Sequence, residues 1–181
     1  MKKINIALVL VLFVVAATLA AQTQTTVFVP GNATGAFGNV DVVVPLVPAL
    51  TVSGPGTIQV TYISGTVDLG GVITGPDGIS FDTKCCQSPL GESRGEARVN
   101  EKKFGALIGV FVPSPRVNHS GFTAIVGTKN ATPVGIMPGG LFFIGTGKAI
   151  EVTQAGTLFL GINDWGASNN TGGFTVEVTG P

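Results

Sequence analysis

The feature that most constrains the fold is a succession of short β-branched and aromatic runs, each bounded by Gly, Pro, Asn or Asp. Such runs between turn formers are typical of the strands of an all-β sandwich or barrel. Long stretches with the apolar period of an amphipathic helix are missing. We therefore predict strands at residues 25–30, 41–46, 57–64, 65–70, 106–112, 140–145, 149–153, 157–162 and 174–179.

The pattern inside two of these runs predicts how they lie in a sheet. In 57–64, the side chains of Ile58, Val60 and Tyr62 would share one face, because residues two apart point to the same side of a strand. The run 106–112 is apolar on both faces, so we expect it to be a central strand.

The N-terminus has the pattern of a secretory signal peptide. Lys2 and Lys3 precede an apolar run that ends in small residues near Ala20 and Ala21. A transmembrane anchor is the alternative, but the run is short for a span. We therefore expect residues 1–21 to be removed, leaving one secreted or periplasmic domain, 22–181, without a membrane anchor.

The charge balance argues against nucleic acid as a partner. The chain has 10 basic and 10 acidic side chains, so loss of Lys2 and Lys3 leaves 8 and 10, a formal net charge of −2. Phosphate backbones are bound by clustered Lys and Arg, and a near-neutral domain without a basic stripe lacks them.

Charged residues are concentrated in one segment, 82–103. It carries 9 of the 18 charged side chains that remain after signal removal. It is either a solvated connection, as a long loop or a short helix, or a loop that frames a binding site.

The motifs of the common enzyme classes are missing. The chain has no GxSxG elbow, HExxH, phosphate-binding loop or dinucleotide fingerprint. His119, its one histidine, lies in a turn-like stretch, where a surface histidine is more often only polar. No pair of carboxylates stands out for glycoside hydrolysis. We expect a protein that is not an enzyme.

Cys85 and Cys86 are adjacent and are the only cysteines. In an oxidising compartment they can close a strained vicinal disulfide, remain as free thiols or link to another chain. One histidine and one adjacent cysteine pair do not make a tetrahedral zinc site.

The segment "INDWGASNN", 162–170, lies between two predicted strands and contains one Asp and two adjacent Asn residues. Calcium takes six to eight oxygen ligands from carboxylates, amides and main-chain carbonyls. Small residues in the segment would let carbonyls turn toward an ion. Asn, Asp and Gly also form ordinary turns, so the residues alone leave both readings open.

The C-terminal half resembles a known family. "FGALIGVFV", "LFFIG" and "GTLFLGINDWGASNNTGGFTVEV" are similar in order and spacing to bacterial calcium-dependent galactophilic lectins of the PA-I type and to secreted bacterial proteins related to them. Upstream, "VTYISGTVDLGGVITGPDGIS" is similar to a strand and Gly-rich loop that line the same lectin site. The resemblance covers about residues 55–180, with a gap over the charged segment.

The resemblance implies a jelly-roll-like β-sandwich, of the galactose-binding-domain-like class, with one calcium at one end. Its ligands would be the side chains of Asp164, Asn169 and Asn170, with the main-chain carbonyl of Leu69. A second carbonyl would come from within 165–168, where the turn is two residues shorter than in the lectins.

The resemblance also implies that sugar hydroxyls coordinate the calcium. We expect Asp164 and Asn169 of that site to contact the sugar, and the side-chain chemistry of Trp165 and Asp77, near the site, adds them as candidate contacts. Trp165 can stack on a sugar ring or fold back on the sandwich. Asp77 can reach a hydroxyl or stay within its turn. The lectins' sugar-binding His is missing after "GPDG", and Gln87 has no secure counterpart.

Two functions follow as expectations. The first is a secreted, calcium-dependent carbohydrate-binding protein, with galactose-type glycans as its implied partners. The second is a structural extracellular subunit of a surface layer, matrix or filament, in which calcium only holds loops together and binds no sugar. A weakly charged, Gly-rich chain could assemble into a homo-oligomer by edge pairing.

Overall fold

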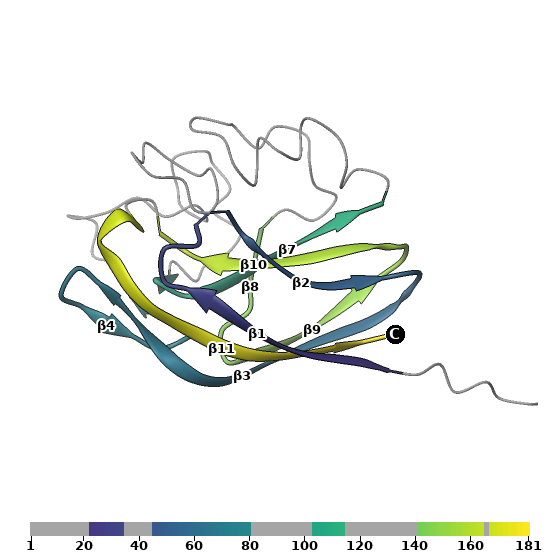
Figure 1. Ribbon diagram of the computed structural model, residues 1–181, viewed down its shortest axis with the longest axis horizontal. Helices are drawn as coiled ribbons and strands as arrows, with labels where there is room; N and C mark the ends of the chain where they lie inside the picture. Colours follow the sequence, from purple (N-terminus) through teal and green to yellow (C-terminus); the bar gives the residue numbers. More distant parts are fainter. Residues whose placement is uncertain (1–21, 35–44, 81–102, 115–140, 165–166) are drawn as a thin grey trace, which may run out of the picture.

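A computed structural model describes residues 22–34, 45–80, 103–114, 141–164 and 167–181. They form two main antiparallel sheets that lie one over the other (Figure 1). The five-stranded sheet contains β1 (Thr23–Pro30), β11 (Asn170–Gly180), β3 (Gly56–Leu69), β4 (Ile73–Thr74) and β9 (Gly147–Val152). The four-stranded sheet contains β2 (Val47–Val52), β10 (Gly156–Ile162), β7 (Leu107–Pro113) and β8 (Phe142–Phe143). A separate two-stranded antiparallel sheet pairs β5 (Ile79–Ser80) with β6 (Lys103–Phe104).

The described part of the chain contains no α-helix. One 3-10 turn, η3 (Ala167–Asn169), lies directly before β11. No described helix is long and apolar enough to cross a membrane. The predicted all-β class is confirmed in this β-sandwich-like arrangement.

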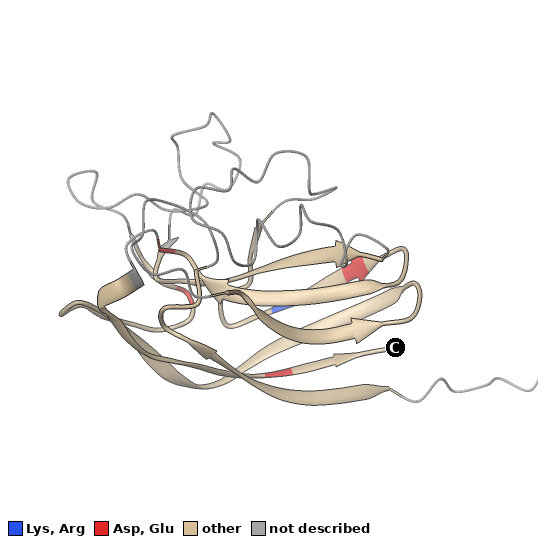
Figure 2. Cartoon of the chain, turned by 45° about the horizontal axis from the view of Figure 1, so that its top comes forward, with Lys and Arg blue, Asp and Glu red and all other residues tan. Residues whose placement is uncertain are grey.

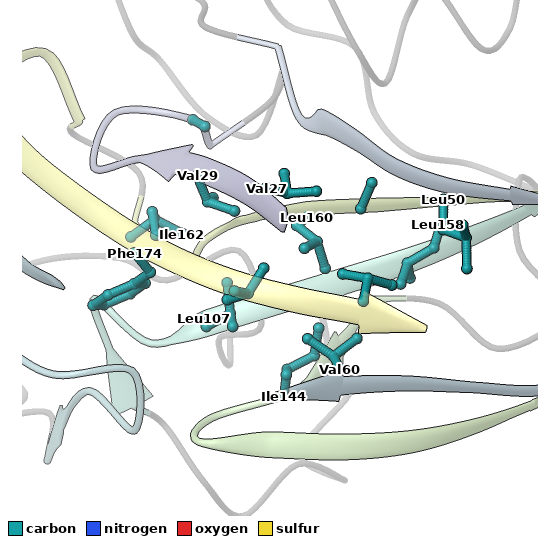
Figure 3. Packing of buried hydrophobic residues seen from close by; sticks show 14 of the residues in the cluster. Val27, Val29, Leu50, Val60, Leu107, Ile144, Leu158, Leu160, Ile162 and Phe174 are labelled. Carbon is teal, nitrogen blue, oxygen red and sulfur yellow. The ribbon is translucent and has the colours of Figure 1, made fainter. Parts of the chain in front are cut away.

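The core lies between the two main sheets. Figure 3 shows side chains from both sheets converging there, among them Val29, Val60 and Phe174 from one sheet and Leu107 and Leu160 from the other. Each of these five is fully buried. Burial of such a side chain stabilises the fold by about 1.5–3 kcal/mol, so this layer holds the sheets together.

The predicted alternation and the central strand are confirmed. In β3, Ile58 and Val60 are buried, while Gln59 and Thr61 are exposed. β7 lies between β10 and β8, and nearly all of its residues are buried.

The prediction of two strands at 57–64 and 65–70 is wrong, because β3 runs unbroken from Gly56 to Leu69. Ile63 is an extra residue opposite β11, where Ser64 pairs with Thr175 and Tyr62 with Val176. After this bulge Gly65 takes a φ of 105°, and a Cβ there would strike the Gly173 carbonyl. The glycine therefore bends one long strand and does not end it.

Three other predicted strands differ from the structure in the residues that it describes. Of 41–46, the structure describes Pro45 and Leu46, which precede β2 and lie outside a strand; Pro45 has no N–H for a ladder. Of 140–145, Phe142–Phe143 is extended in β8. β11 begins at Asn170, before the predicted 174–179, because Gly172 and Gly173 adopt positive φ values and continue the ladder.

Acidic and basic residues are sparse on the described ribbon (Figure 2). Most of the charge-rich segment 82–103 lies outside the described residues, and Lys103 opens β6. The predicted signal peptide, 1–21, also lies outside them, as do Cys85, Cys86 and His119.

Candidate cation site at the start of β11

The site centres on two buried polar side chains from the connection between β10 and β11. Asp164 follows two residues after β10 and is 2% exposed, and Asn170 opens β11 and is 6% exposed. The Asn170 Nδ2 group donates a hydrogen bond of 2.8 Å to Asp164 Oδ2. The structure therefore brings together two of the side chains that the sequence predicts as calcium ligands.

The orientation of the Asn170 amide follows from its partners. Its Nδ2 group donates both to Asp164 Oδ2 and to the Gly31 carbonyl, the latter at 2.9 Å. Both partners are acceptors. Turning the amide over would place Oδ1 against two oxygens, so the NH₂ end is fixed on this side.

The amide oxygen of Asn170 is left unsatisfied. Among the described residues, Oδ1 is buried and has no hydrogen-bond partner. A buried acceptor without a partner costs about 1–3 kcal/mol, and native proteins contain few such atoms. An orphaned amide oxygen beside a buried carboxylate is a donor set suited to a hard cation, which would satisfy the oxygen.

The main chain around Asp164 is anchored on the four-stranded sheet side. The Asn163 N–H donates to the Ala106 carbonyl, and the Asn163 carbonyl accepts from the Gly105 N–H, both at 2.9 Å. The Asp164 N–H donates to the Ile162 carbonyl at 3.0 Å. These bonds fix the main chain at Asp164 and therefore the position from which its side chain extends.

Asn169 and Leu69 lie next to this pair. Asn170 and Leu69 are register partners in the β11–β3 ladder, and the Leu69 N–H closes the following hairpin on the Val72 carbonyl at 2.9 Å. Asn169 ends η3 and is exposed, and its side-chain amide lies against Gly70. Gly70 has a φ of 78°, and a Cβ there would strike Asn169 Nδ2.

The four residues predicted as calcium ligands therefore lie at one end of the β3–β11 pair, where Asp164 bonds to Asn170 and the Asn169 side chain lies against Gly70. Residues 69–70 and 164–170 are distant in sequence, and the ladder register joins them. In Figure 1 this end is where β11 begins, near the β3–β4 hairpin.

Asp77 takes part in a different contact. Its Oδ1 accepts a hydrogen bond of 3.0 Å from the Thr146 N–H, in the turn that leads into β9. The neighbouring Pro76 carbonyl accepts from the Leu107 N–H at 2.8 Å. The structure thus gives Asp77 a role within the turns, and its contact with a sugar stays a prediction.

Trp165 and Gln87 lie outside the described residues, as does Gly166, so half of the 165–168 segment expected to supply a second carbonyl is not described. Among the residues that the structure describes, no three His, Cys, Asp or Glu side chains gather as a metal-binding group. The candidate site contains one carboxylate and two amides, so any cation there would depend on neutral oxygens.

Gly31 is the contact that sequence reasoning missed. It lies 139 positions from Asn170 in the chain. It contributes a main-chain carbonyl, which any residue carries. The only local signal is "PG" at the end of a predicted strand, which indicates a turn and no specific partner.

No protein-family model matches this chain, and no curated protein matches it either.

Proposed function

We propose that this protein is a secreted, calcium-dependent carbohydrate-binding protein without catalytic activity. One calcium is held by Asp164, Asn169 and Asn170 with the Leu69 carbonyl, at the end of a jelly-roll-like sandwich. The observation that carries the proposal is the buried, unpartnered Asn170 Oδ1 beside the Asp164 carboxylate.

The ligand chemistry follows from what calcium accepts. A calcium held by a few protein oxygens on one side keeps water on the other, and two neighbouring hydroxyls of a sugar can replace that water. Asn169 is exposed to solvent beside the candidate site, where its amide can hydrogen-bond a sugar hydroxyl. Trp165, next to Asp164 in sequence, supplies a flat surface for a sugar ring.

Isothermal titration calorimetry tests whether calcium binds at the proposed ligands. We expect calcium to bind the wild-type protein and Glu151→Gln, and to bind Asp164→Asn at least about tenfold more weakly, since one charged ligand is lost. Glu151 is a matched control because it is exposed on β9 and bonded to Thr57. Equal affinity for the two variants would show that the site is misassigned.

A sugar panel tests the second part. Galactose-type and other monosaccharides are added to the calcium-loaded protein and to the protein with excess chelator. Binding that requires calcium supports the proposed function. Calcium binding without sugar binding would contradict the carbohydrate-binding part and leave a structural role for the metal.

A structural extracellular subunit is the second candidate, and the edge strand β1 favours it. β1 ends the five-stranded sheet, and its eight residues, TQTTVFVP, carry no charge. Charged residues on an edge normally prevent pairing with another chain. Calcium-dependent assembly in light scattering, without sugar binding, would favour this role.

A further inference from the structure

We propose that the turn formed by residues 30–34, at the end of β1, is a positioning element of the cation site. This inference rests on the proposed calcium site and adds a third chain segment to it. The Gly31 carbonyl holds the NH₂ end of the Asn170 amide at 2.9 Å, which directs the oxygen of that amide away from Gly31 and leaves it for the cation.

The turn is itself fixed to both main sheets. The Gly31 N–H donates to the Gly172 carbonyl of β11 at 2.9 Å. Two residues later, the Ala33 carbonyl accepts from the Ile162 N–H, at the end of β10, at 2.8 Å. The segment therefore bridges the two strands that carry the site, and its position depends on both.

The turn also has no room to shift. A Cβ on Gly31 would lie 2.7 Å from the Thr171 carbonyl oxygen and 3.0 Å from Val67 Cγ1. A Cβ on Gly161, on the other side, would lie 2.6 Å from the Ala33 carbonyl oxygen. A side chain at Gly31 must therefore displace main chain, and with it the carbonyl that holds Asn170.

This geometry couples cation binding to the turn. A cation on Asn170 Oδ1 polarises the amide and strengthens the hydrogen bond from Nδ2 to the Gly31 carbonyl, because bonds in a chain reinforce one another. By linkage, a turn that is in place raises cation affinity by the same factor by which the cation stabilises the turn.

Calcium titration of two variants tests the positioning role. We expect Gly31→Ala to weaken calcium binding about five- to tenfold, the effect of losing one hydrogen bond to the amide. The control is Val27→Ala, which removes packing from β1 at a residue that is 9% exposed and pairs with Val176, six residues along β11 from Asn170. Its calcium affinity should stay within about twofold of wild type despite its lower melting temperature.

Hydrogen exchange on the wild-type protein gives an answer even if Gly31→Ala does not fold. Calcium should slow exchange at the Gly31 and Ile162 amides more than at Ser114, whose N–H donates to the Ala155 carbonyl away from the site. Unchanged protection of Gly31 and Ile162 in a protein that binds calcium, or wild-type affinity in Gly31→Ala, would overturn the positioning role alone. A wild-type protein that takes up no calcium would overturn the proposed function, and this inference with it.

Discussion

The Asn170 amide is held at its NH₂ end by the Gly31 carbonyl and Asp164 Oδ2, while its oxygen has no hydrogen-bond partner among the described residues. The sequence marks Asp164 and the Asn pair as oxygen-rich, because carboxylates and amides suit calcium. It does not show which amide atom is satisfied. That depends on two acceptors, one of them the main chain of Gly31, which only the fold brings near.

Replacing Asn170 by Ala should have two separable effects. Without calcium, stability should fall by less than about 3 kcal/mol, because the Gly31 carbonyl and Asp164 Oδ2 both lose a donor while the cost of the unsatisfied Asn170 Oδ1 is removed. The rise in melting temperature that calcium causes in the wild-type protein should disappear. Thermal unfolding with calcium and with chelator measures both effects, and a variant that keeps the full calcium response would contradict the role of Oδ1.

Gly70→Ala tests the place of Asn169. The new Cβ would displace the Asn169 amide, and the φ of 78° costs a non-glycine residue about 1–2 kcal/mol. We expect weaker calcium binding together with that loss of stability, measured by calorimetry and chemical unfolding. Gly54→Ala is the matched control, since a Cβ there meets nothing within 4 Å. Calcium affinity equal to that of the control would exclude Asn169 as a ligand.

At the scale of strands, periodicity predicted most elements but not their ends. Apolar runs and two-residue alternation located β3, β7 and β10, because burial on one or both faces leaves that pattern. The predicted break before Gly65 and the predicted start of the last strand at Phe174 were both wrong, and for the same reason. Glycine reads as a turn signal in sequence, but Gly65 lies in a strand bend that its partner strand holds.

Two phenylalanines on paired strands should differ sharply when truncated. Phe174 is fully buried opposite Gly65, with its ring edge-on to Tyr62 at a centroid distance of 6.0 Å, while Phe28 is 57% exposed. Phe174→Ala should lower the free energy of unfolding by about 3–5 kcal/mol, because it opens a cavity between the sheets. Phe28→Ala should change it by less than about 0.5 kcal/mol. Denaturant unfolding compares them, and similar losses would contradict the assigned faces of β1 and β11.

At the scale of the molecule, the candidate site joins three segments: the turn after β1, the end of β3 and the β10–β11 connection. The second and third segments lie within residues 55–180, which the resemblance to lectins covers, so their place in the site could be predicted. The first segment lies upstream of those residues, and its own residues indicate only a turn. The contact between Gly31 and Asn170 makes the turn after β1 part of the framework of the candidate site.

The calcium affinity of the site should be limited by its low negative charge. With one carboxylate among the proposed ligands, affinity should lie near the range of extracellular calcium modules, about 0.1–1 mM. Calcium at about 10 mM should then stabilise the fold by roughly 1.4–2.7 kcal/mol through mass action. Magnesium should stabilise it less, because it gives up water reluctantly. Melting curves at matched ionic strength measure this, and equal effects of calcium, magnesium and sodium would point to non-specific screening.

The most direct test of the site is a crystal structure of the protein grown with calcium. We expect an ion about 2.3–2.6 Å from Asn170 Oδ1, an Asp164 carboxylate oxygen and the Leu69 carbonyl. Ordered water bonded to Asn170 Oδ1, with no ion at this position at saturating calcium, would contradict the account.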